Sequence, residues 1–217
     1  MTDRAVEAVM PDRDGFGAQL LRMIGTLRTE DIAGIGIGLP GRIDGARGEI
    51  LSAGYLDIAG LDLPGLVLRE TGLTTAIEND ATMALLGEAR GTDETCTVMI
   101  TIGTGIGGAI LRHGRPWHGG GIAGQFGHLV VAADGPLCKC GRRGCVETFA
   151  AGPALGAAIA DAGLPAETDA NDLLTRAAAG EATAEAILRG WADPLGRAID
   201  TIVAAFDPTR ILIGGGL

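Results

Sequence analysis

The 217-residue sequence is poor in lysine and in aromatic side chains. Lys139 is the only lysine and the formal net charge is −10, so there is no basic patch to neutralise a nucleic-acid backbone. Nucleic acid is therefore not an expected partner. Aromatic residues make up 3% of the chain, whereas glycine occurs 37 times. This composition indicates tight turns and close backbone contacts rather than a large aromatic core.

Long apolar runs are also missing. The longest uncharged apolar stretch, Val98–Leu111, is too short and too rich in glycine to be a transmembrane helix. The opening residues 1–7 lack the apolar segment of a secretion signal. We therefore expect a soluble, cytoplasmic protein with no membrane partner.

Cysteine is scarce, yet three of the four cysteines follow one histidine closely, in the order His128, Cys138, Cys140 and Cys145. One imidazole and three thiolates form the ligand set of a tetrahedral structural zinc site. Gly141 and Gly144 would let the loop turn sharply enough to bring the thiols together. The alternatives are unrelated thiols in a glycine-rich loop, or a disulfide, which needs an oxidising compartment that nothing in the sequence indicates.

Strand and helix patterns alternate along the chain and predict an α/β fold. We expect strands at 32–39, 74–77, 97–102, 107–111 and 210–213, and helices at 16–27, 81–90, 147–162, 170–179 and 182–206. Composition shifts near residues 92–96, which predicts two domains, 1–92 and 93–217. Cys96, at the edge of an apolar run, is most simply a buried small hydrophobic residue.

A polar triplet, Glu78-Asn79-Asp80, lies where a predicted strand meets a predicted helix. Open α/β sheets bind ligands beyond the carboxyl ends of their strands, so a carboxylate here is a candidate catalytic group. Taken alone, Asn79 or Asp80 is more simply a helix N-cap.

Glycines dominate two further segments. The segment Gly103–Gly108 matches GxGxxG, but a hairpin rather than a helix follows it, and no Lys-Ser/Thr pair is present. It therefore predicts a turn whose N–H groups and Thr104 hydroxyl hold a phosphate, or a glycine hairpin without a ligand. The segment 211–216 ends in three glycines, which suits a nucleotide base or ribose against the backbone, or simply a tight turn.

Together these residues resemble the ROK family of sugar kinases and sugar-responsive regulators, which has the actin/hexokinase-like (ribonuclease H-like) two-domain fold. The matching segments are 36–41, 78–80, 103–108, 121–128 and 138–147. The last of them is the most specific. The resemblance implies a cytoplasmic enzyme of carbohydrate metabolism, with structural zinc, ATP and Mg²⁺ as cofactors and a homodimeric assembly.

The resemblance also implies roles for individual residues. Asp80 is the general base that accepts the proton of the sugar hydroxyl, and His128 serves both zinc and sugar through its two ring nitrogens. The implied sugar-site residues are Gly41, Arg42, Asn79, Asp80, Gly105, Gln125, His128 and Glu147. Gly103 and Thr104 are implied at the ATP phosphates, and Gly214 and Gly215 at the adenosine. Gln125 stands where many members have glutamate, and glutamine keeps an acceptor while adding donors.

The chain lacks two parts of the family pattern, the N-terminal Asp-x-Gly-Gly-Thr phosphate loop and a C-terminal segment beyond residue 217. We therefore expect a fold truncated at both ends, with exposed strand edges in the first domain and with the sugar and zinc side intact. The expected function is ATP-dependent phosphorylation of a hexose or N-acetylhexosamine, with little turnover by this exact chain. The alternative is an inactive sugar-binding pseudokinase or the effector domain of a regulator. DNA binding is disfavoured because no helix-turn-helix or basic stripe is present.

Overall fold

The computed structural model describes residues 4–91 and 94–216. The chain forms two compact units that divide between Ala84 and Leu85, inside helix α3 (Asp80–Glu88). The domain boundary that we expect at residue 92 falls outside the described residues, so the predicted domain limits stay a prediction. Each unit is described by itself below.

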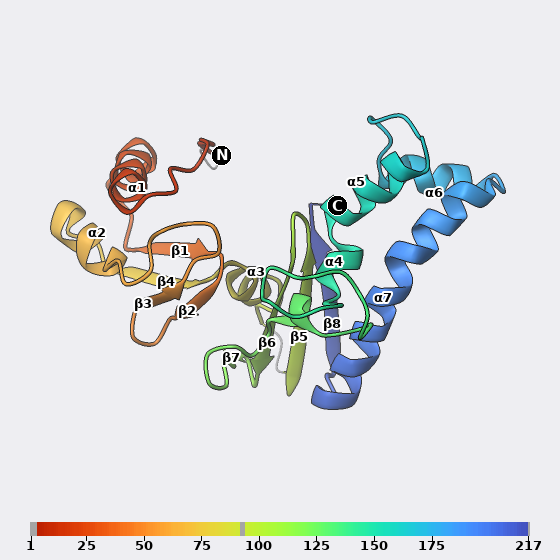
Figure 1. Cartoon of the computed structure of the whole chain (residues 1–217). Helices are drawn as coiled ribbons and strands as arrows, with labels where there is room; N and C mark the ends of the chain where they lie inside the picture. Colours follow the sequence, from red (N-terminus) through yellow and green to blue (C-terminus); the bar gives the residue numbers. More distant parts are fainter. Residues whose placement is uncertain (1–3, 92–93, 217) are drawn as a thin grey trace. The chain divides into compact units, whose positions relative to one another are not determined.

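Unit 1, residues 4–84, contains two small sheets and two helices besides the start of α3 (Figure 1). Its elements are α1 (Arg13–Leu27), β1 (Ile35–Leu39), β2 (Arg42–Asp44), β3 (Glu49–Ser52), α2 (Leu63–Thr71) and β4 (Thr75–Asn79). Strand β1 pairs in parallel with β4, and β2 pairs antiparallel with β3. The parallel pair places the ends of β1 and β4 together, because Leu39 is opposite Asn79.

Apolar side chains from both strands of the parallel pair pack against the two helices of unit 1. Ile37 and Leu39 of β1 and Ile77 of β4 form one buried cluster with Phe16 of α1 and Val67 of α2. Burial of such side chains stabilises the unit by about 1.5–3 kcal/mol for each large aliphatic residue. This packing fixes the direction of β1 and β4, and therefore the place where their polar ends lie.

Strand β1 has a second edge that pairs with no other strand among the described residues. The Ile35 N–H donates to the Thr74 carbonyl at 2.9 Å, so the alternating geometry of a strand turns the N–H groups of Gly36 and Gly38 away from β4. An apolar cavity of about 420 Å³ lies beside β1 and is lined from α1 by Met23 and Leu27. The exposed strand edge that we expect in the first domain is thus present in β1.

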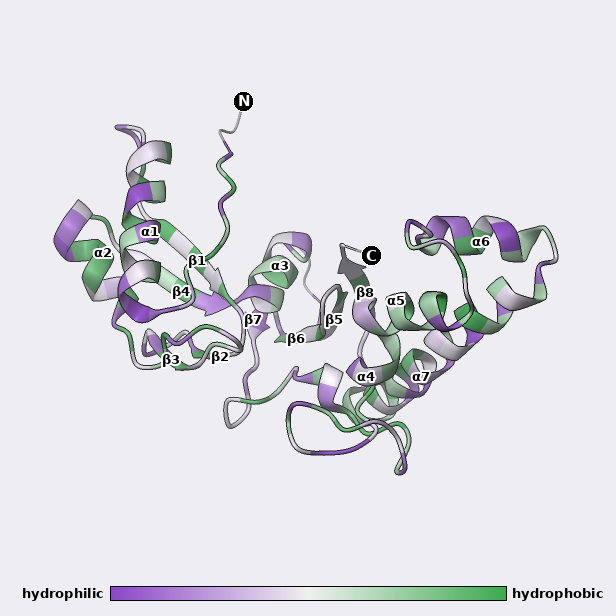
Figure 2. Ribbon diagram, turned by 45° about the horizontal axis from the view of Figure 1, so that its top comes forward, coloured by the Kyte–Doolittle hydropathy of each residue, from purple (hydrophilic) through white to green (hydrophobic). Residues whose placement is uncertain are grey.

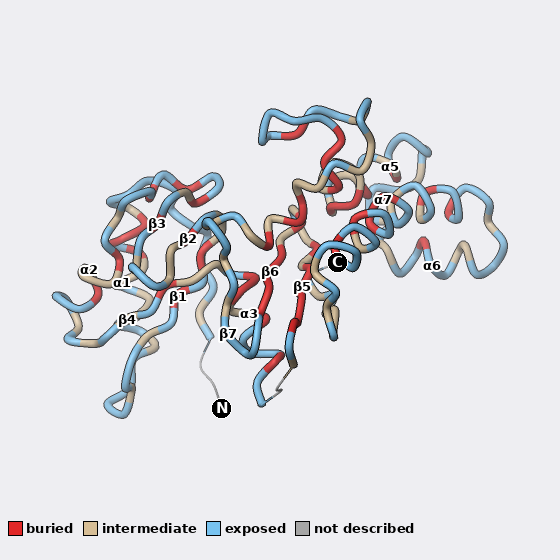
Figure 3. Tube along the Cα trace, turned by 90° about the horizontal axis from the view of Figure 1, so that it is seen from below, coloured by how far each residue is buried: buried red, intermediate tan, exposed pale blue. Residues whose placement is uncertain are grey.

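Unit 2, residues 85–216, is built on one four-stranded sheet with the order β7-β6-β5-β8. Its elements are β5 (Cys96–Ile102), β6 (Ile106–Arg112), β7 (Arg115–Pro116), the 3-10 helix η1 (Phe126–His128), α4 (Glu147–Ala150), α5 (Gly152–Asp161), α6 (Ala170–Ala178), α7 (Ala182–Phe206) and β8 (Arg210–Gly215). Strand β5 pairs antiparallel with β6 and parallel with β8. β5 and β6 are therefore the most buried strands of the sheet (Figure 3).

Helix α7 covers the β5–β6–β8 sheet with an apolar stripe. Leu195 and Ile202 of α7 pack with Val98 and Ile100 of β5 and with Ile110 of β6 in one cluster.

The N-terminal half of α7 forms a second, smaller core with α5 and α6. Ile187 of α7 packs there with Leu155 and Ile159 of α5 and with Leu173 of α6. Purple and green residues alternate along α6, as expected of an amphipathic helix that covers one side of this core (Figure 2).

Most of the predicted elements are confirmed, with one correction. The hairpin β2–β3, the helix α2, the short strand β7 and the 3-10 helix η1 were not expected from the sequence. The single helix expected at 147–162 is instead two helices. Ala151 is extended and ends the first one, and Pro153 lies in the first turn of the second, where proline is well tolerated. Cys96 is buried, as expected, with 6% of its surface exposed. Among the described residues no helix is long and apolar enough to cross a membrane.

The different environments of β1 and β5 predict different patterns of amide hydrogen exchange. In β1 the amides of Gly36 and Gly38 should exchange rapidly while that of Ile37 is protected, since only alternate N–H groups point toward β4. In β5, which has a partner on each side, the consecutive amides of Met99 and Ile100 should both be protected. Residue-resolved exchange followed by NMR measures this, and equal protection of Gly36 and Ile37 would show that a further segment pairs with β1.

Candidate functional site

The polar triplet of the sequence lies at the end of β4 and the start of α3. The side chain of Asn79 bonds in two directions: its Oδ1 accepts from the Thr82 N–H at 3.2 Å, and its Nδ2 donates to the Gly41 carbonyl at 3.0 Å. Asn79 therefore caps α3, one of the two possibilities left open by the sequence, and also holds the turn that follows β1.

Asp80 is the first residue of α3 and is exposed. Its Oδ1 accepts a hydrogen bond from the Ala81 N–H at 2.8 Å. The carboxylate thus lies at the positive end of the helix dipole, which favours a negative charge. With Asn79 engaged as the cap, Asp80 is the residue of this junction that faces solvent.

The four sugar-site residues that the resemblance implies in unit 1 gather at one place. Gly41 and the exposed Arg42 follow the end of β1, and Asn79 and Asp80 follow the end of β4 beside it. The geometry therefore satisfies the rule that ligands of open α/β sheets lie beyond the carboxyl ends of the strands.

The glycine-rich segment of unit 2 forms a hairpin, not the strand-to-helix turn of a dinucleotide fold. β5 and β6 pair in continuous antiparallel register as far as Ile102 and Ile106, and Gly103, Thr104 and Gly105 make the turn between them. The Gly103 N–H donates to the Gly105 carbonyl at 2.9 Å, and Thr104 at the tip is exposed. The hairpin that the sequence predicts is confirmed.

The last strand brings the second glycine segment to the same end of the sheet. β8 runs parallel to β5, with Gly214 opposite Thr101 and Gly215 opposite Ile102. The Gly216 N–H donates to the Ile102 carbonyl at 3.1 Å. All the residues assigned by resemblance to ATP, Gly103, Thr104, Gly214 and Gly215, therefore lie at the adjacent ends of β5 and β8.

Gly108, the last glycine of the motif, has a packing role that the sequence did not reveal. A Cβ atom at this position would overlap the Phe126 ring and lie 2.7 Å from the Gly124 carbonyl oxygen. Only glycine lets the segment that leads to His128 rest directly on β6. The two glycines of the motif thus have different roles: Gly103 forms the turn, and Gly108 allows close packing.

The loop from residue 128 to residue 147 is held by short backbone pairings. Val131 N–H donates to the Gly144 carbonyl and Val146 N–H to the Leu129 carbonyl, both at 2.8 Å. These bonds bring the two ends of the loop together, so His128 lies beside Cys145 although they are far apart in sequence.

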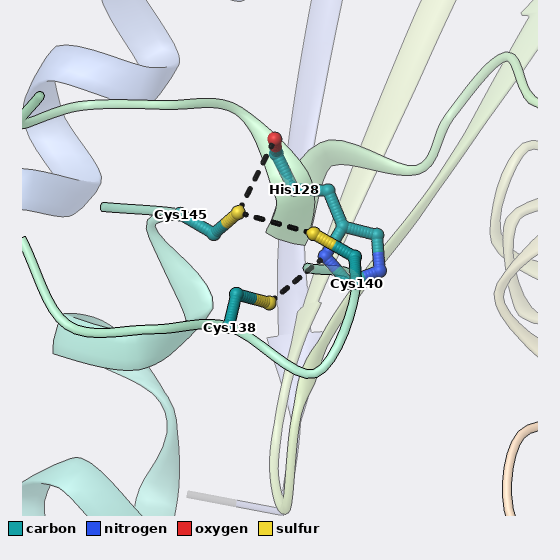
Figure 4. A group of neighbouring side chains, drawn as sticks. All are labelled: His128, Cys138, Cys140 and Cys145. Atoms are coloured by element: carbon teal, nitrogen blue, oxygen red, sulfur yellow. Dashed lines mark hydrogen bonds between the residues drawn. The ribbon is translucent and has the colours of Figure 1, made fainter. Parts of the chain in front are cut away.

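The predicted metal ligands converge inside this loop (Figure 4). The ligand atoms of His128, Cys138, Cys140 and Cys145 all lie within 4.8 Å of one another. The Cys138 Sγ–His128 Nδ1 and Cys140 Sγ–Cys145 Sγ distances are both 3.6 Å. Two ligands of a tetrahedral ion with bonds of about 2.1–2.3 Å are about 3.5–3.8 Å apart, so the group fits a metal ion of that geometry.

The cysteine thiols differ in their tendency to ionise. Hydrogen bonds from the backbone and side chain of Arg142 lower the pKa of the exposed Cys140 to about 6, whereas burial raises the pKa of Cys145 to about 12. All four cysteines of the chain are free thiols in the structure. A cation would offset the cost of the buried thiolates, because metal ligation requires the deprotonated form.

Glu147 ends the loop at residues 128–147, called the metal loop below, and Gln125 lies shortly before its start. Glu147 begins α4, and its Oε2 accepts a hydrogen bond from the Ile106 N–H at 2.9 Å. Gln125 immediately precedes η1 and is half-buried. Together with Gly105 and His128, these residues place the implied sugar ligands of unit 2 around one hairpin turn and one loop.

Two backbone hydrogen bonds in this region could not be predicted from the sequence. The N–H of Ile106 binds Glu147, and the N–H of Gly152 donates to the Gly103 carbonyl at 2.8 Å. Neither residue type carries a side-chain signal for such a role. Only the juxtaposition of the hairpin with α4 and α5 defines these contacts.

The ROK family model matches residues 17–217. The chain belongs to the ROK family. It is 35% identical over 208 residues to the glucokinase of Thermotoga maritima, which covers 87% of this chain and 65% of that protein. It is 39% identical over 150 residues to the N-acetylmannosamine kinase of Citrobacter koseri, with 68% of this chain and 51% of that protein covered. The chain thus spans less than two thirds of the length of these relatives.

The crystal structure of a ROK family glucokinase from Streptomyces griseus, in complex with glucose and AMPPNP, superposes with a TM-score of 0.79 at 28% identity. The match covers 97% of this chain and 74% of that chain. The fold is therefore the actin/hexokinase-like α/β fold, as the sequence predicts.

The metal loop predicts unequal effects of alanine at its two turn glycines. Both have a positive φ, 86° at Gly141 and 71° at Gly144, but a Cβ on Gly144 would overlap the Ala132 carbonyl while one on Gly141 meets nothing. Gly141→Ala should lower the free energy of unfolding by about 1–2 kcal/mol and Gly144→Ala by about 3 kcal/mol or more. Urea unfolding compares the two variants, and equal losses would contradict the loop geometry.

Proposed function

We propose that this chain contributes the sugar-binding and phosphoryl-transfer residues of a hexose or N-acetylhexosamine kinase. The observation that carries the proposal is the exposed carboxylate of Asp80 at the β4–α3 junction of a ROK family chain, beside the turn at Gly41. The names of the two relatives, a glucokinase and an N-acetylmannosamine kinase, support this substrate class.

Asp80 is the proposed general base. Phosphoryl transfer to a sugar requires a hydroxyl oxygen in line with the γ-phosphate and a group that takes its proton. The carboxylate of Asp80 is exposed, and its Oδ1 is oriented by the Ala81 N–H, which leaves Oδ2 to accept that proton. Asn79 supports this role indirectly, because its two hydrogen bonds fix the junction from which Asp80 projects.

The polar groups around the metal loop are the proposed sugar contacts of unit 2. The Nδ1 atom of His128 faces Cys138, which leaves Nε2 for a sugar hydroxyl. Gln125 and Glu147 add an amide and a carboxylate, and both kinds of group bind hydroxyls well. We infer that the amide of Gln125 changes the preference among sugars, since it can donate as well as accept.

The adjacent ends of β5 and β8 are the proposed nucleotide site. The turn of Gly103 and Thr104 offers backbone N–H groups and a hydroxyl to phosphates, and Gly214 and Gly215 offer bare backbone to the adenosine. The AMPPNP in the superposed Streptomyces glucokinase structure supports ATP as the donor. Mg²⁺ would accompany ATP and neutralise its phosphates.

The metal proposed for the loop is zinc in a structural role. Four closing ligands, three of them sulfur, match structural zinc sites rather than catalytic ones, which keep an open position. The ion would hold the residues on either side of the loop rigidly. Homodimer formation and a cytoplasmic location stay predictions from the resemblance.

A sugar-binding protein without turnover is the second candidate. It would use the same proposed sugar contacts and would differ from the kinase only in its lack of turnover. A DNA-binding regulator is disfavoured by the net charge of −10 and the single lysine.

The proposed function predicts that Asp80→Asn separates sugar binding from phosphoryl transfer. Glucose, N-acetylglucosamine, N-acetylmannosamine and fructose are each tested for a rise in melting temperature and for ADP release. One sugar should stabilise both the parent and Asp80→Asn, while any turnover falls by about 10²–10⁴ in the variant, because the amide cannot take a proton. Asp14→Asn is the matched control, since Asp14 is also an exposed residue in a first helical turn.

The results distinguish the two candidates. Sugar-dependent stabilisation with no ADP release from the parent identifies the non-catalytic sugar-binding protein. Equal turnover by the parent and Asp80→Asn removes Asp80 from the mechanism. Stabilisation by none of the sugars contradicts both candidates.

The zinc proposal predicts about one zinc ion per chain in the purified protein. Cys140→Ala should remove the metal and lower the melting temperature, whereas Cys96→Ala, which changes the cysteine outside the cluster, should leave the metal content unchanged. Elemental analysis with thermal unfolding measures both effects. A metal-free preparation that is fully folded and as stable as the loaded protein would contradict the proposal.

A further inference from the structure

Glu147 connects the metal loop with the turn at the tip of the β5–β6 hairpin. Its Oε2 accepts the hydrogen bond of Ile106, the first residue of β6 after the turn, at 2.9 Å. A Cβ atom on Gly105 would lie 2.6 Å from the same oxygen. The carboxylate therefore occupies the space that a side chain at position 105 would need.

The other side of the turn is held from the same stretch of chain. The Gly103 carbonyl accepts a hydrogen bond from the N–H of Gly152, at the start of α5, at 2.8 Å. Residues 147–152 thus hold the turn at both ends, while Thr104 at its tip is exposed. The position of the turn depends on where α4 begins.

Helix α4 begins directly from the metal loop. The Cys145 carbonyl accepts hydrogen bonds from the N–H and the hydroxyl of Thr148, at 2.9 and 2.7 Å. Cys145 and Val146 are both fully buried, with 0% exposure, and the Val146 N–H is bonded to the Leu129 carbonyl next to His128. An ion bound by His128 and Cys145 would therefore fix the first turn of α4 from both sides.

We propose that Glu147 is a positioning residue that transmits the state of the metal loop to the Gly103–Gly105 turn. When the loop holds its ion, the carboxylate keeps the turn in one conformation through Oε2, and Oε1 stays available for a ligand. When the ion is removed, α4 loses its anchor and the turn becomes mobile. The consequence for nucleotide binding rests on the proposed function, whereas the coupling itself does not.

Hydrogen exchange at the Ile106 amide tests the coupling without any assay of activity. In the metal-loaded parent this amide should be protected, and chelation should speed its exchange by about tenfold, the effect of losing one hydrogen bond. The amide of Ile100, within the central strand β5, is the internal reference and should change little.

Substitutions separate the role of Glu147 from that of the metal. In the Glu147→Ala variant the Ile106 amide should exchange fast even when the protein holds its metal, and chelation should change its exchange rate little. Glu147→Gln should restore protection, because the amide oxygen can accept the same hydrogen bond. Gly105→Ala should reproduce the effect of Glu147→Ala, since the added methyl group displaces the carboxylate, and the double variant should be no worse than either single one.

Gly103→Ala is the matched control for the exchange measurement, because an added Cβ at this position of the same turn meets nothing within 4 Å. Elemental analysis verifies the metal content of each variant. Gly105→Ala leaves every residue of α4 and of the metal loop unchanged, so it tests the contact even if Glu147→Ala fails to fold.

Two results would overturn the proposal: an Ile106 amide whose exchange ignores both chelation and Glu147→Ala, or equal acceleration at Ile106 and Ile100 on chelation. AMPPNP binding provides the separate test of the nucleotide role, with affinity expected to fall about tenfold in Gly105→Ala. If AMPPNP binds no form of the protein while the exchange pattern holds, the assignment of the turn to ATP is wrong and the coupling stands.

Discussion

Close contact between strand β6 and the segment at residues 124–128 is the constraint on which unit 2 depends. Gly108 has no side chain, so the Phe126 ring and the Gly124 carbonyl rest against the strand. This contact places His128 at the mouth of the metal loop and brings the loop against the β5–β6 hairpin. A side chain at position 108 would separate the sheet from the loop and with it most of the candidate site.

Helix α4 connects the metal loop mechanically with the hairpin turn. Backbone pairings and the convergent thiols hold the shape of the loop, and Leu129, Val131 and Val146 pack into the core of unit 2. Burial raises the pKa of Cys145, and a cation is the natural partner for thiols that are forced together in this way. Because Glu147 begins α4 two residues after Cys145, the same rigidity reaches the turn at Gly103–Gly105.

Unit 1 uses a different device to present its polar residues. Its parallel strands are held by an apolar cluster with α1 and α2, and the polar residues follow where those strands end. Asn79 closes the amino end of α3 and holds the Gly41 turn, which leaves Asp80 exposed in the field of the helix dipole. Apolar packing thus fixes the positions of β1 and β4, whereas the hydrogen bonds of Asn79 and the charge of Asp80 determine which of the two side chains is exposed to solvent.

The sequence by itself determined the features that depend on local residue types and their spacing. Ligand identity and spacing predicted the His128–Cys145 cluster, periodicity predicted β5, β6 and α7, and the glycine-rich turn followed by an apolar strand predicted the hairpin. Tertiary structure alone decided the features that depend on contacts between distant segments. The pairing of β8 with β5, the choice of Asn79 rather than Asp80 as the cap, the packing role of Gly108 and the bond from Ile106 to Glu147 belong here. The physical reason is that backbone N–H groups and glycines look alike wherever they occur in a sequence, and only their neighbours in space give them different tasks.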